Sequence, residues 1–187
     1  EESNLVAAGI CFCNTLRCLA LGRCHQGEGL MNQIMTHLME IQVSRGNTHL
    51  FLYTKCSSAR FFADLGFYEI ARTDGQVVFM ENRKNGFSSY LHRLSGESGE
   101  SGRASSQARC AALVMNANPF TLGHLYLTER AAAETDTVHL FKVSEDASLI
   151  PFKMRRRLIT EGTSHQEQII YHDSGPYLLS SAPFHRY

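Results

Sequence analysis

Thr121, Gly123 and His124 form a short polar motif, T-x-G-H, whose residues could bind an anion. The hydroxyl and the imidazole can each donate a hydrogen bond, and a glycine lets a ligand approach the backbone closely. A helix that begins at such a motif adds backbone N–H groups and the positive end of its dipole. These residue types at this spacing predict a phosphate site.

The segments around the motif are of the kind that would place it at the edge of a sheet. Cys110–Met115 is a short apolar run typical of a buried parallel strand, and Asn116–Pro119 is a cluster of turn formers. Leu125–Glu134 is rich in leucine and alanine and predicts a helix. The motif would then follow the carboxyl end of a parallel strand, where phosphates bind in open α/β sheets. It resembles the H-x-G-H signature of nucleotidyltransferases; the alternative is that His124 is an ordinary histidine at a helix N-terminus.

The α/β pattern continues towards the end of the chain. Ser144–Asp146 follows the next expected strand at its carboxyl end, where ligands bind in such sheets. Three further elements are expected: a parallel strand over His139–Val143, a helix from Pro151 to Gly162, and a short strand over Ile169–His172.

A second candidate phosphate site lies in the first half of the chain. Two strands, Leu5–Phe12 and Leu16–Leu21, are expected to form a hairpin, and an amphipathic helix is expected to begin at Leu30 and to end at Gly46. The polar, glycine-rich segment between hairpin and helix could hold a pyrophosphate on its N–H groups. Its residues are Gln26, Gly27, Glu28, Gly29 and Leu30.

This glycine-rich segment resembles the Q/R-x-x-G-x-G/A loop of Gcn5-related acetyltransferases, which binds the pyrophosphate of coenzyme A. Glu28, His37 and Glu40 are candidate general bases for such a domain, and the sequence selects none of them. The remaining elements expected in this half are a strand over Thr48–Thr54, a helix over Ser57–Leu65, a strand over Gln76–Glu81 and a closing helix over Phe87–Leu94.

Composition narrows the class of protein. The 187 residues are 43% hydrophobic and 19% charged, as in a globular protein, and the formal net charge of zero gives no electrostatic case for nucleic acid or an anionic membrane surface. The chain has neither a transmembrane run nor a signal peptide, so we expect a cytoplasmic protein. Six cysteines without zinc-site spacing are expected to be reduced thiols: Cys11, Cys13, Cys18, Cys24, Cys56 and Cys110.

A polar segment, residues 95–107, divides the chain. It consists mostly of serine, glycine, glutamate and arginine, cannot bury a core and predicts a flexible linker. We therefore expect an α/β protein with two domains. Residues 1–94 would form a mixed, Gcn5-like acetyltransferase sheet, and residues 108–187 a Rossmann-like nucleotidyltransferase domain, with the first incomplete at its beginning and the second at its end.

The whole run of motifs resembles the citrate lyase ligase (citrate lyase synthetase) family. The resemblance is carried by HQGEGL, THLFLYTK, VMNANPFTLGH, HLFKVSED, a P-F-x-x-R helix and SGPYLLSSAPF. It implies an enzyme that activates acetate with ATP as acetyl-adenylate and acetylates the thiol of a coenzyme-A-like prosthetic group on the citrate lyase acyl carrier subunit. AMP and pyrophosphate are the implied products, and magnesium the implied counter-ion of ATP.

The resemblance also implies roles for particular residues. His124 and Thr121 would act on the ATP phosphates as catalytic residues, and the segment Gln26 to Leu30 would bind the coenzyme-A-like group. No residue is implied as a protein ligand of a metal. The implied ATP site consists of Asn116, Phe120, Thr121, Gly123, His124, Lys142 and Arg155.

Two rival functions remain open at this stage. The chain could be an acetyltransferase that uses acetyl-coenzyme A, or a binding module for a nucleotide or a carrier protein without catalytic activity. Acetate-dependent release of pyrophosphate from ATP would favour the ligase, transfer from acetyl-coenzyme A the first rival, and binding without turnover the second.

Overall fold

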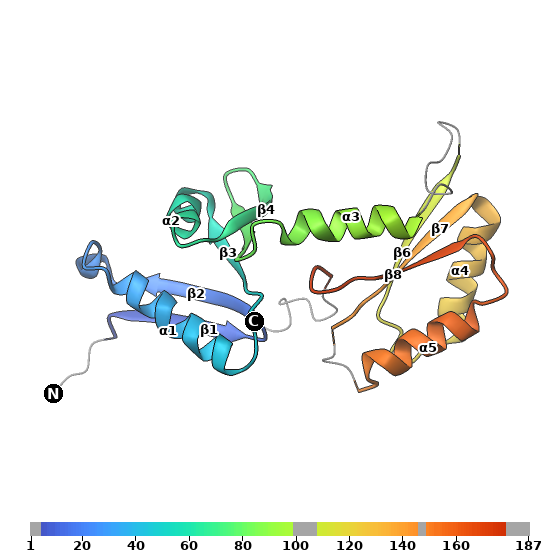
Figure 1. Ribbon diagram of the computed structural model, residues 1–187, viewed down its shortest axis with the longest axis horizontal. Helices are drawn as coiled ribbons and strands as arrows, with labels where there is room; N and C mark the ends of the chain where they lie inside the picture. The colour runs from blue at the N-terminus through green and yellow to red at the C-terminus, as the bar shows by residue number, and fades with distance from the viewer. Residues whose placement is uncertain (1–4, 99–107, 146–148, 179–187) are drawn as a thin grey trace. The chain divides into compact units, whose positions relative to one another are not determined.

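The computed structural model describes residues 5–98, 108–145 and 149–178 (Figure 1). The chain divides into two compact units, Glu1–Ser88 and Ser89–Tyr187, which we call unit 1 and unit 2. Both units are built from a sheet and helices, so the expected α/β class is confirmed.

Unit 1 is built on a mixed five-stranded sheet with the order β1-β2-β3-β5-β4. β2 and β3 run parallel, with Thr15 paired to Phe51 and Leu16 to Leu52, and the other neighbouring strands are antiparallel. The strands are β1 (Ala7–Phe12), β2 (Thr15–Leu21), β3 (Phe51–Lys55), β4 (Tyr68–Thr73) and β5 (Val77–Glu81).

Two α-helices cover the core of unit 1. Met35 and Leu38 of the longer one are buried in a cluster with strand residues such as Leu52, because apolar residues recur at helical spacing along it. This helix ends just before Gly46, whose φ of 82° suits a glycine. The helices are α1 (Leu30–Ser44) and α2 (Ala59–Asp64), preceded by the short 3-10 turns η1 (Arg23–His25) and η2 (Cys56–Ser58).

Strand β4 is absent from the sequence-based expectation, which placed no strand between the helix Ser57–Leu65 and the strand Gln76–Glu81. Its six residues are mostly exposed, so they lack the apolar alternation that predicts a strand. Backbone pairing with β5 holds it in place instead, from Tyr68 opposite Glu81 to Thr73 opposite Val77.

Helix α3 (Gly86–Ser98) extends further than expected. Its first turn is held by the buried carboxylate of Glu81, which accepts a hydrogen bond from the Phe87 N–H at 2.7 Å. Residues 95–98 are helical, so the prediction that a flexible linker begins at residue 95 is wrong; residues 99–107 lie outside the described part of the chain. The boundary between the units falls within α3, after Ser88.

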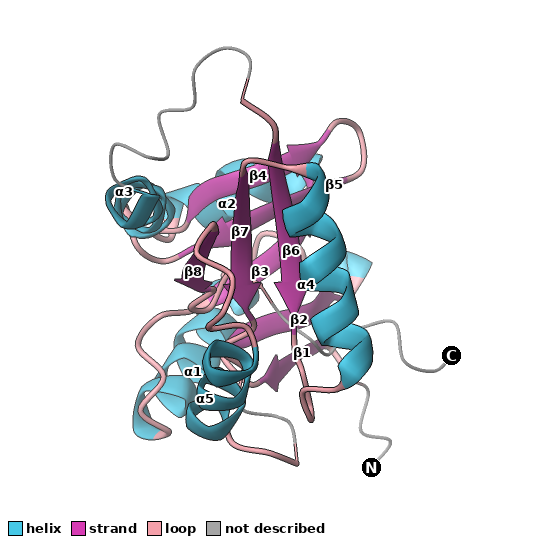
Figure 2. Cartoon of the chain, turned by 90° about the vertical axis from the view of Figure 1, so that its right-hand side faces the viewer, coloured by secondary structure: helices cyan, strands magenta, loops and turns pink. Residues whose placement is uncertain are grey.

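Unit 2 contains a three-stranded parallel sheet with the order β6-β7-β8 (Figure 2). This confirms the expected parallel strands and the strand–turn–helix order around the T-x-G-H motif. The expectation that Cys110–Met115 is buried is wrong, because alternate residues of this strand are exposed, Val114 by 58%. The strands are β6 (Cys110–Met115), β7 (Thr137–Lys142) and β8 (Ile169–Asp173), and the helices that connect them are α4 (Leu122–Glu134) and α5 (Phe152–Gly162).

The two faces of the unit 2 sheet differ in character. Val138 and Leu140 of β7 are fully buried in an apolar cluster to which α4 and α5 contribute. The alternate residue His139 lies on the opposite face, because successive side chains of a strand point to opposite sides. There it contacts His172 of β8, which is bound in turn by Glu97 of α3.

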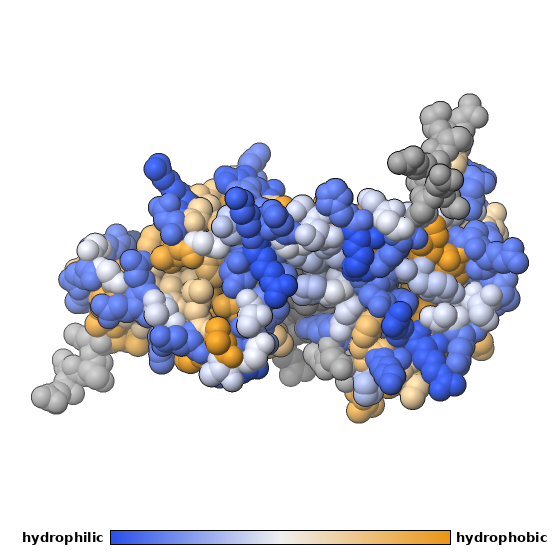
Figure 3. All heavy atoms as spheres, viewed as in Figure 1, coloured by the Kyte–Doolittle hydropathy of each residue, from blue (hydrophilic) through white to orange (hydrophobic). Residues whose placement is uncertain are grey.

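The surface of each unit mixes hydrophilic and apolar side chains on the face drawn in Figure 3. Within the described ranges, no helix is both long and apolar enough to cross a membrane. All six cysteines are free thiols, as predicted.

Candidate functional site

Thr121 and His124 form a reciprocal capping box at the start of α4, with Thr121 as the N-cap residue. The Thr121 N–H donates a hydrogen bond to His124 Nδ1 at 3.1 Å, and the Thr121 hydroxyl lies 2.8 Å from the same nitrogen. These contacts satisfy a backbone donor that has no partner within the helix. The motif therefore forms the helix terminus itself.

The capping box determines the tautomer of His124. Nδ1 accepts the Thr121 N–H, so in the neutral imidazole the proton is on Nε2. Gly123, in the first turn of α4, is exposed, and an added Cβ would come no nearer than 3.7 Å to Thr121 Oγ1. The helix start thus combines an imidazole donor, backbone N–H groups and space beside Gly123, which is the arrangement expected of a phosphate site.

The loop before the motif is attached to α5 and to Ile150, the residue before the N-cap of this helix. Asn118 Oδ1 accepts a hydrogen bond from the Ile150 N–H at 3.1 Å. The Phe120 ring belongs to the apolar core, lies against Gly162 and stacks on the His124 ring with centroids 5.7 Å apart. Phe120, expected at the ATP site, therefore packs as a core residue that supports the histidine.

Arg155 is buried, with only 1% of its surface exposed. Its Nε donates to the Ile150 carbonyl at 2.9 Å and Nη2 donates to the Glu145 carbonyl at 2.6 Å. Its Nη1 lies 2.7 Å from Asn116 Oδ1 and 2.9 Å from the backbone carbonyls of Asn116 and Val143. The guanidinium is thus enclosed by protein acceptors, whereas the resemblance implied that Arg155 binds ATP directly. The next arginine, Arg156, is exposed.

Lys142 is also buried, on the core face at the carboxyl end of β7. Its Nζ lies 3.2 Å from Asp173 Oδ1 and 5.1 Å from the centroid of the Tyr171 ring. Arg156 Nε approaches the other oxygen of Asp173 at 3.5 Å. The Lys142 ammonium is therefore buried beside the Asp173 carboxylate and the Tyr171 ring, whereas the resemblance implied that it belongs to the ATP site.

Two serines fix the carboxyl ends of β7 and β8 to each other. The Ser144 N–H donates to Ser174 Oγ at 2.9 Å, and the Gly175 N–H donates to Ser144 Oγ at 3.0 Å. The sequence placed Ser144 and Glu145 at this edge, and the structure agrees; Asp146 lies outside the described residues. Pro151 is the N-cap of α5 rather than its first helical residue.

The glycine-rich segment of unit 1 precedes α1 as expected. Gly29 is the N-cap of this 15-residue helix, with φ 74°, and Gly27 has φ 93°, a region that favours glycine. Neither glycine has a neighbour within 4 Å of an added Cβ, so the space above the loop is open. Gln26 ends η1, Leu30 begins α1, and the Glu28 carboxylate contacts His25 Nδ1 at 3.1 Å.

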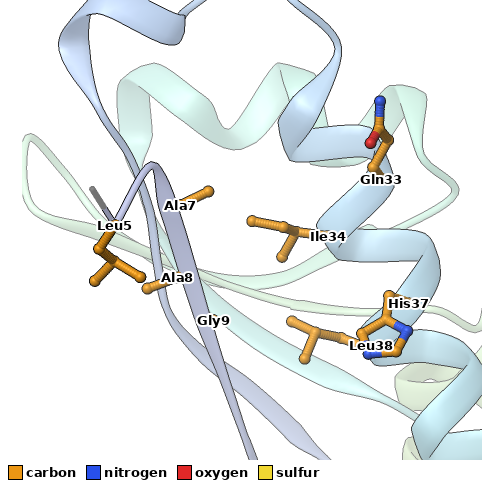
Figure 4. Close-up of a pocket in the computed structure, with 8 residues that line it drawn as sticks. All are labelled: Leu5, Ala7, Ala8, Gly9, Gln33, Ile34, His37 and Leu38. Carbon is orange, nitrogen blue, oxygen red and sulfur yellow. The ribbon is translucent and has the colours of Figure 1, made fainter. Parts of the chain in front are cut away.

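A separate, open cavity of about 440 Å³ lies between the start of β1 and α1 (Figure 4). Ala7 and Ile34 point towards each other across it, and Gly9 allows β1 to approach Leu38 closely. Its lining is mostly apolar and does not include the glycine-rich segment. The lining residues are Leu5, Ala7, Ala8, Gly9, Gln33, Ile34, His37 and Leu38.

Three hydrogen-bonded side chains that the sequence did not predict, Glu97, His172 and His139, lie on the face of the unit 2 sheet opposite the apolar cluster. Glu97 Oε2 lies 2.7 Å from His172 Nδ1, and His172 Nε2 lies 2.9 Å from His139 Nδ1. Burial and the neighbouring His172 lower the pKa of His139. The three residues come from three elements, so no spacing in the sequence could have indicated them.

The fold of unit 2 and its site define a class of protein. A capped helix start at the carboxyl end of a parallel strand is the arrangement of α/β domains that bind phosphate groups at this edge of the sheet.

The comparisons with known proteins identify the family. Residues 110–187 match the model of the citrate lyase ligase C-terminal domain. The citrate (pro-3S)-lyase ligase of Klebsiella pneumoniae is 38% identical over 186 residues, which are 100% of this chain and 53% of the relative. The corresponding ligases of Escherichia coli and Haemophilus influenzae are 35% and 34% identical, over 98% and 100% of this chain and 51% and 54% of their own lengths. The chain belongs to the citrate lyase ligase family, and it spans about half the length of these relatives.

Solved structures of two acetyltransferases are similar to part of the chain. A putative N-acetyltransferase from Lactobacillus plantarum is 25% identical, covering 36% of this chain and 49% of its own, with a TM-score of 0.33. The ribosomal-protein-S18-alanine N-acetyltransferase from Escherichia coli is 27% identical, covering 40% and 57%, also with a TM-score of 0.33.

Proposed function

We propose that this chain takes part in an ATP-dependent ligase reaction that activates citrate lyase. In this reaction acetate is activated as acetyl-adenylate, and the acetyl group is transferred to the thiol of the coenzyme-A-like prosthetic group of the citrate lyase acyl carrier subunit. The proposal is supported by the relatives, which are named as ligases of citrate lyase. It is also supported by the phosphate-binding character of the T-x-G-H helix start.

The first chemical step is displacement at phosphorus. An acetate oxygen attacks the α-phosphorus of ATP, the bond from that phosphorus to the bridging oxygen of the β-phosphate breaks, and pyrophosphate leaves. Such a step depends on alignment and on stabilisation of phosphate charge. His124 Nε2–H and the N–H groups at the start of α4 would supply donors, and Gly123 would allow close approach. Magnesium would enter as the counter-ion of the ATP phosphates.

The second step transfers the acetyl group. The thiol sulfur attacks the acetyl carbonyl, the bond to the AMP phosphate oxygen breaks, and the thiol proton is released to solvent. We place the coenzyme-A-like group on the loop Gln26–Leu30 of unit 1, because its open space and two glycines with positive φ suit a pyrophosphate. α1 adds the N-terminal end of its dipole there.

The observation that carries the proposal is the capping box. It fixes His124 with Nδ1 turned to the Thr121 N–H, so that the proton on Nε2 is available as a donor beside an open glycine. A histidine that only packed at a helix start would not need open space at Gly123.

Pyrophosphate release tests the proposal. The 187-residue chain is incubated with ATP, magnesium and the acyl carrier subunit, with and without acetate, and pyrophosphate is measured. Acetate-dependent release that is lost in His124→Ala and kept in His165→Ala supports the proposal; His165 is an exposed histidine of the same unit. Acetyl transfer from acetyl-coenzyme A without ATP, or ATP binding without turnover, would instead favour the acetyltransferase or the binding module.

A further inference from the structure

The loop of residues 116–120, which leads into T-x-G-H, is held at three points. All three anchors are on α5 or on the residue before its N-cap. Asn116 is bound through both of its oxygens by the Arg155 guanidinium, and Asn118 Oδ1 accepts the Ile150 N–H. Phe120 packs against Gly162, where an added Cβ would lie 2.5 Å from the ring. Helix α5 is therefore the support of this loop.

The Arg155 side chain connects more than the loop. The same guanidinium that binds Asn116, which follows β6, also binds the carbonyls of Val143 and Glu145, which follow β7. Its Nε reaches the Ile150 carbonyl just before α5. One planar group with five N–H donors thus fixes the carboxyl ends of two parallel strands and the start of a helix.

We propose that Arg155 is a positioning residue for the nucleotide site, and that its guanidinium holds the loop 116–120 in the conformation that binds phosphate. It acts through Asn116 and the strand ends and does not touch the nucleotide. This inference rests on the proposed binding of ATP at T-x-G-H. Lysine cannot replace the arginine, because a single ammonium cannot reach carbonyls spread around a planar fork.

Three consecutive arginines provide a matched test. Arg155→Lys keeps the charge and removes the fork, whereas Arg157→Lys makes the same change at an exposed residue that pairs with Glu161. Titration calorimetry with ATP and magnesium, below the melting temperature of each variant, is expected to show at least a tenfold loss of affinity for Arg155→Lys. Arg157→Lys is expected to stay within twofold of the parent. Equal affinities for the parent and Arg155→Lys would overturn the proposal.

Hydrogen exchange gives a readout that does not need ATP. The Thr121 N–H is bound by His124 and the Ile150 N–H by Asn118, so both amides report the state of the loop. We expect both to exchange at least tenfold faster in Arg155→Lys than in Arg157→Lys. If the parent chain binds no ATP, the proposed function fails for this chain, and unchanged exchange at Thr121 would then separately overturn the positioning role.

Asn118→Ala provides a second test of the proposal if the Arg155→Lys variant does not fold. It removes the anchor on Ile150 and leaves the buried guanidinium in place. A fall of about threefold or more in ATP affinity, with faster exchange at Ile150 and Thr121, is expected if the anchored loop conformation is what binds phosphate. ATP affinity and Thr121 exchange equal to those of the parent would refute it.

Discussion

Replacing Gly123 by alanine should stabilise unit 2 and weaken nucleotide binding at the same time. Gly123 is the second residue of α4, and an added Cβ meets only Thr121 Oγ1, at an ordinary contact distance of 3.7 Å. Alanine is the better helix former by about 0.5–1 kcal/mol, with the lower value suited to a first turn. A methyl group there would occupy the space through which we propose a phosphate approaches the backbone.

The expected magnitudes can be checked separately. A gain of about 0.5 kcal/mol corresponds to a rise of about 2–4 °C in melting temperature for a unit of this size. ATP affinity should fall at least tenfold, which is about 1.4 kcal/mol. Circular dichroism melting gives the first quantity, and titration calorimetry with ATP and magnesium the second.

Gly162→Ala is the matched control for this experiment. An added Cβ there would lie 2.5, 3.0 and 3.3 Å from three atoms of the Phe120 ring, so overpacking should cost about 1–3 kcal/mol. The two Gly→Ala changes should therefore shift the melting temperature in opposite directions. ATP affinity in Gly123→Ala equal to that of the parent would refute the placement of the phosphate beside this glycine.

Three further predictions concern the cap, the histidine pair and the loop of unit 1. Thr121→Ala removes the hydroxyl of the capping box and should lower the stability of unit 2 by about 0.5–2 kcal/mol in urea unfolding, with weaker ATP binding because His124 loses a partner. Burial and the neighbouring His172 lower the pKa of His139 below the ordinary histidine value of about 6.5, so the unfolded chain binds more protons. Stability should therefore decline as pH falls below about 6.5, and urea unfolding at pH 7.5 and 5.5 should show a smaller decline in His139→Gln. Gly29→Ala forces a φ of 74° on a residue with Cβ and should lower the stability of unit 1 by about 1–2 kcal/mol without changing ATP affinity. Weakened ATP binding in this variant would contradict the proposal that the two loops bind different ligands.

Elements with a clear local pattern could be predicted from the sequence. Cys110–Met115 is an apolar run followed by turn formers, and the structure has a strand with these bounds. Tyr68–Thr73 gave no such signal, because the backbone pairing of an exposed edge strand leaves little trace in side-chain type. The end of α3 was missed for a related reason: Glu97 is stabilised there by contacts with Arg93 and His172, which composition does not reveal.

The candidate site was only partly predictable. The order of strand, turn and helix was enough to place Thr121, Gly123 and His124 at the start of α4. Residue type alone does not predict which of the three consecutive arginines is buried and which are exposed. Successive residues of a helix point about 100° apart, so Arg155 enters the core, while Arg156 and Arg157 remain on the solvated face.

The capping box has a consequence for the entropy of ligand binding. Immobilising a side chain on binding typically costs about 0.5–1.5 kcal/mol. His124 and Thr121 already hold each other in the folded chain, so a phosphate would meet side chains whose rotamers helix formation has selected. Folding of α4 thus preorganises the His124 donor. A change that loosens the start of this helix should therefore first lower the affinity for a phosphate ligand.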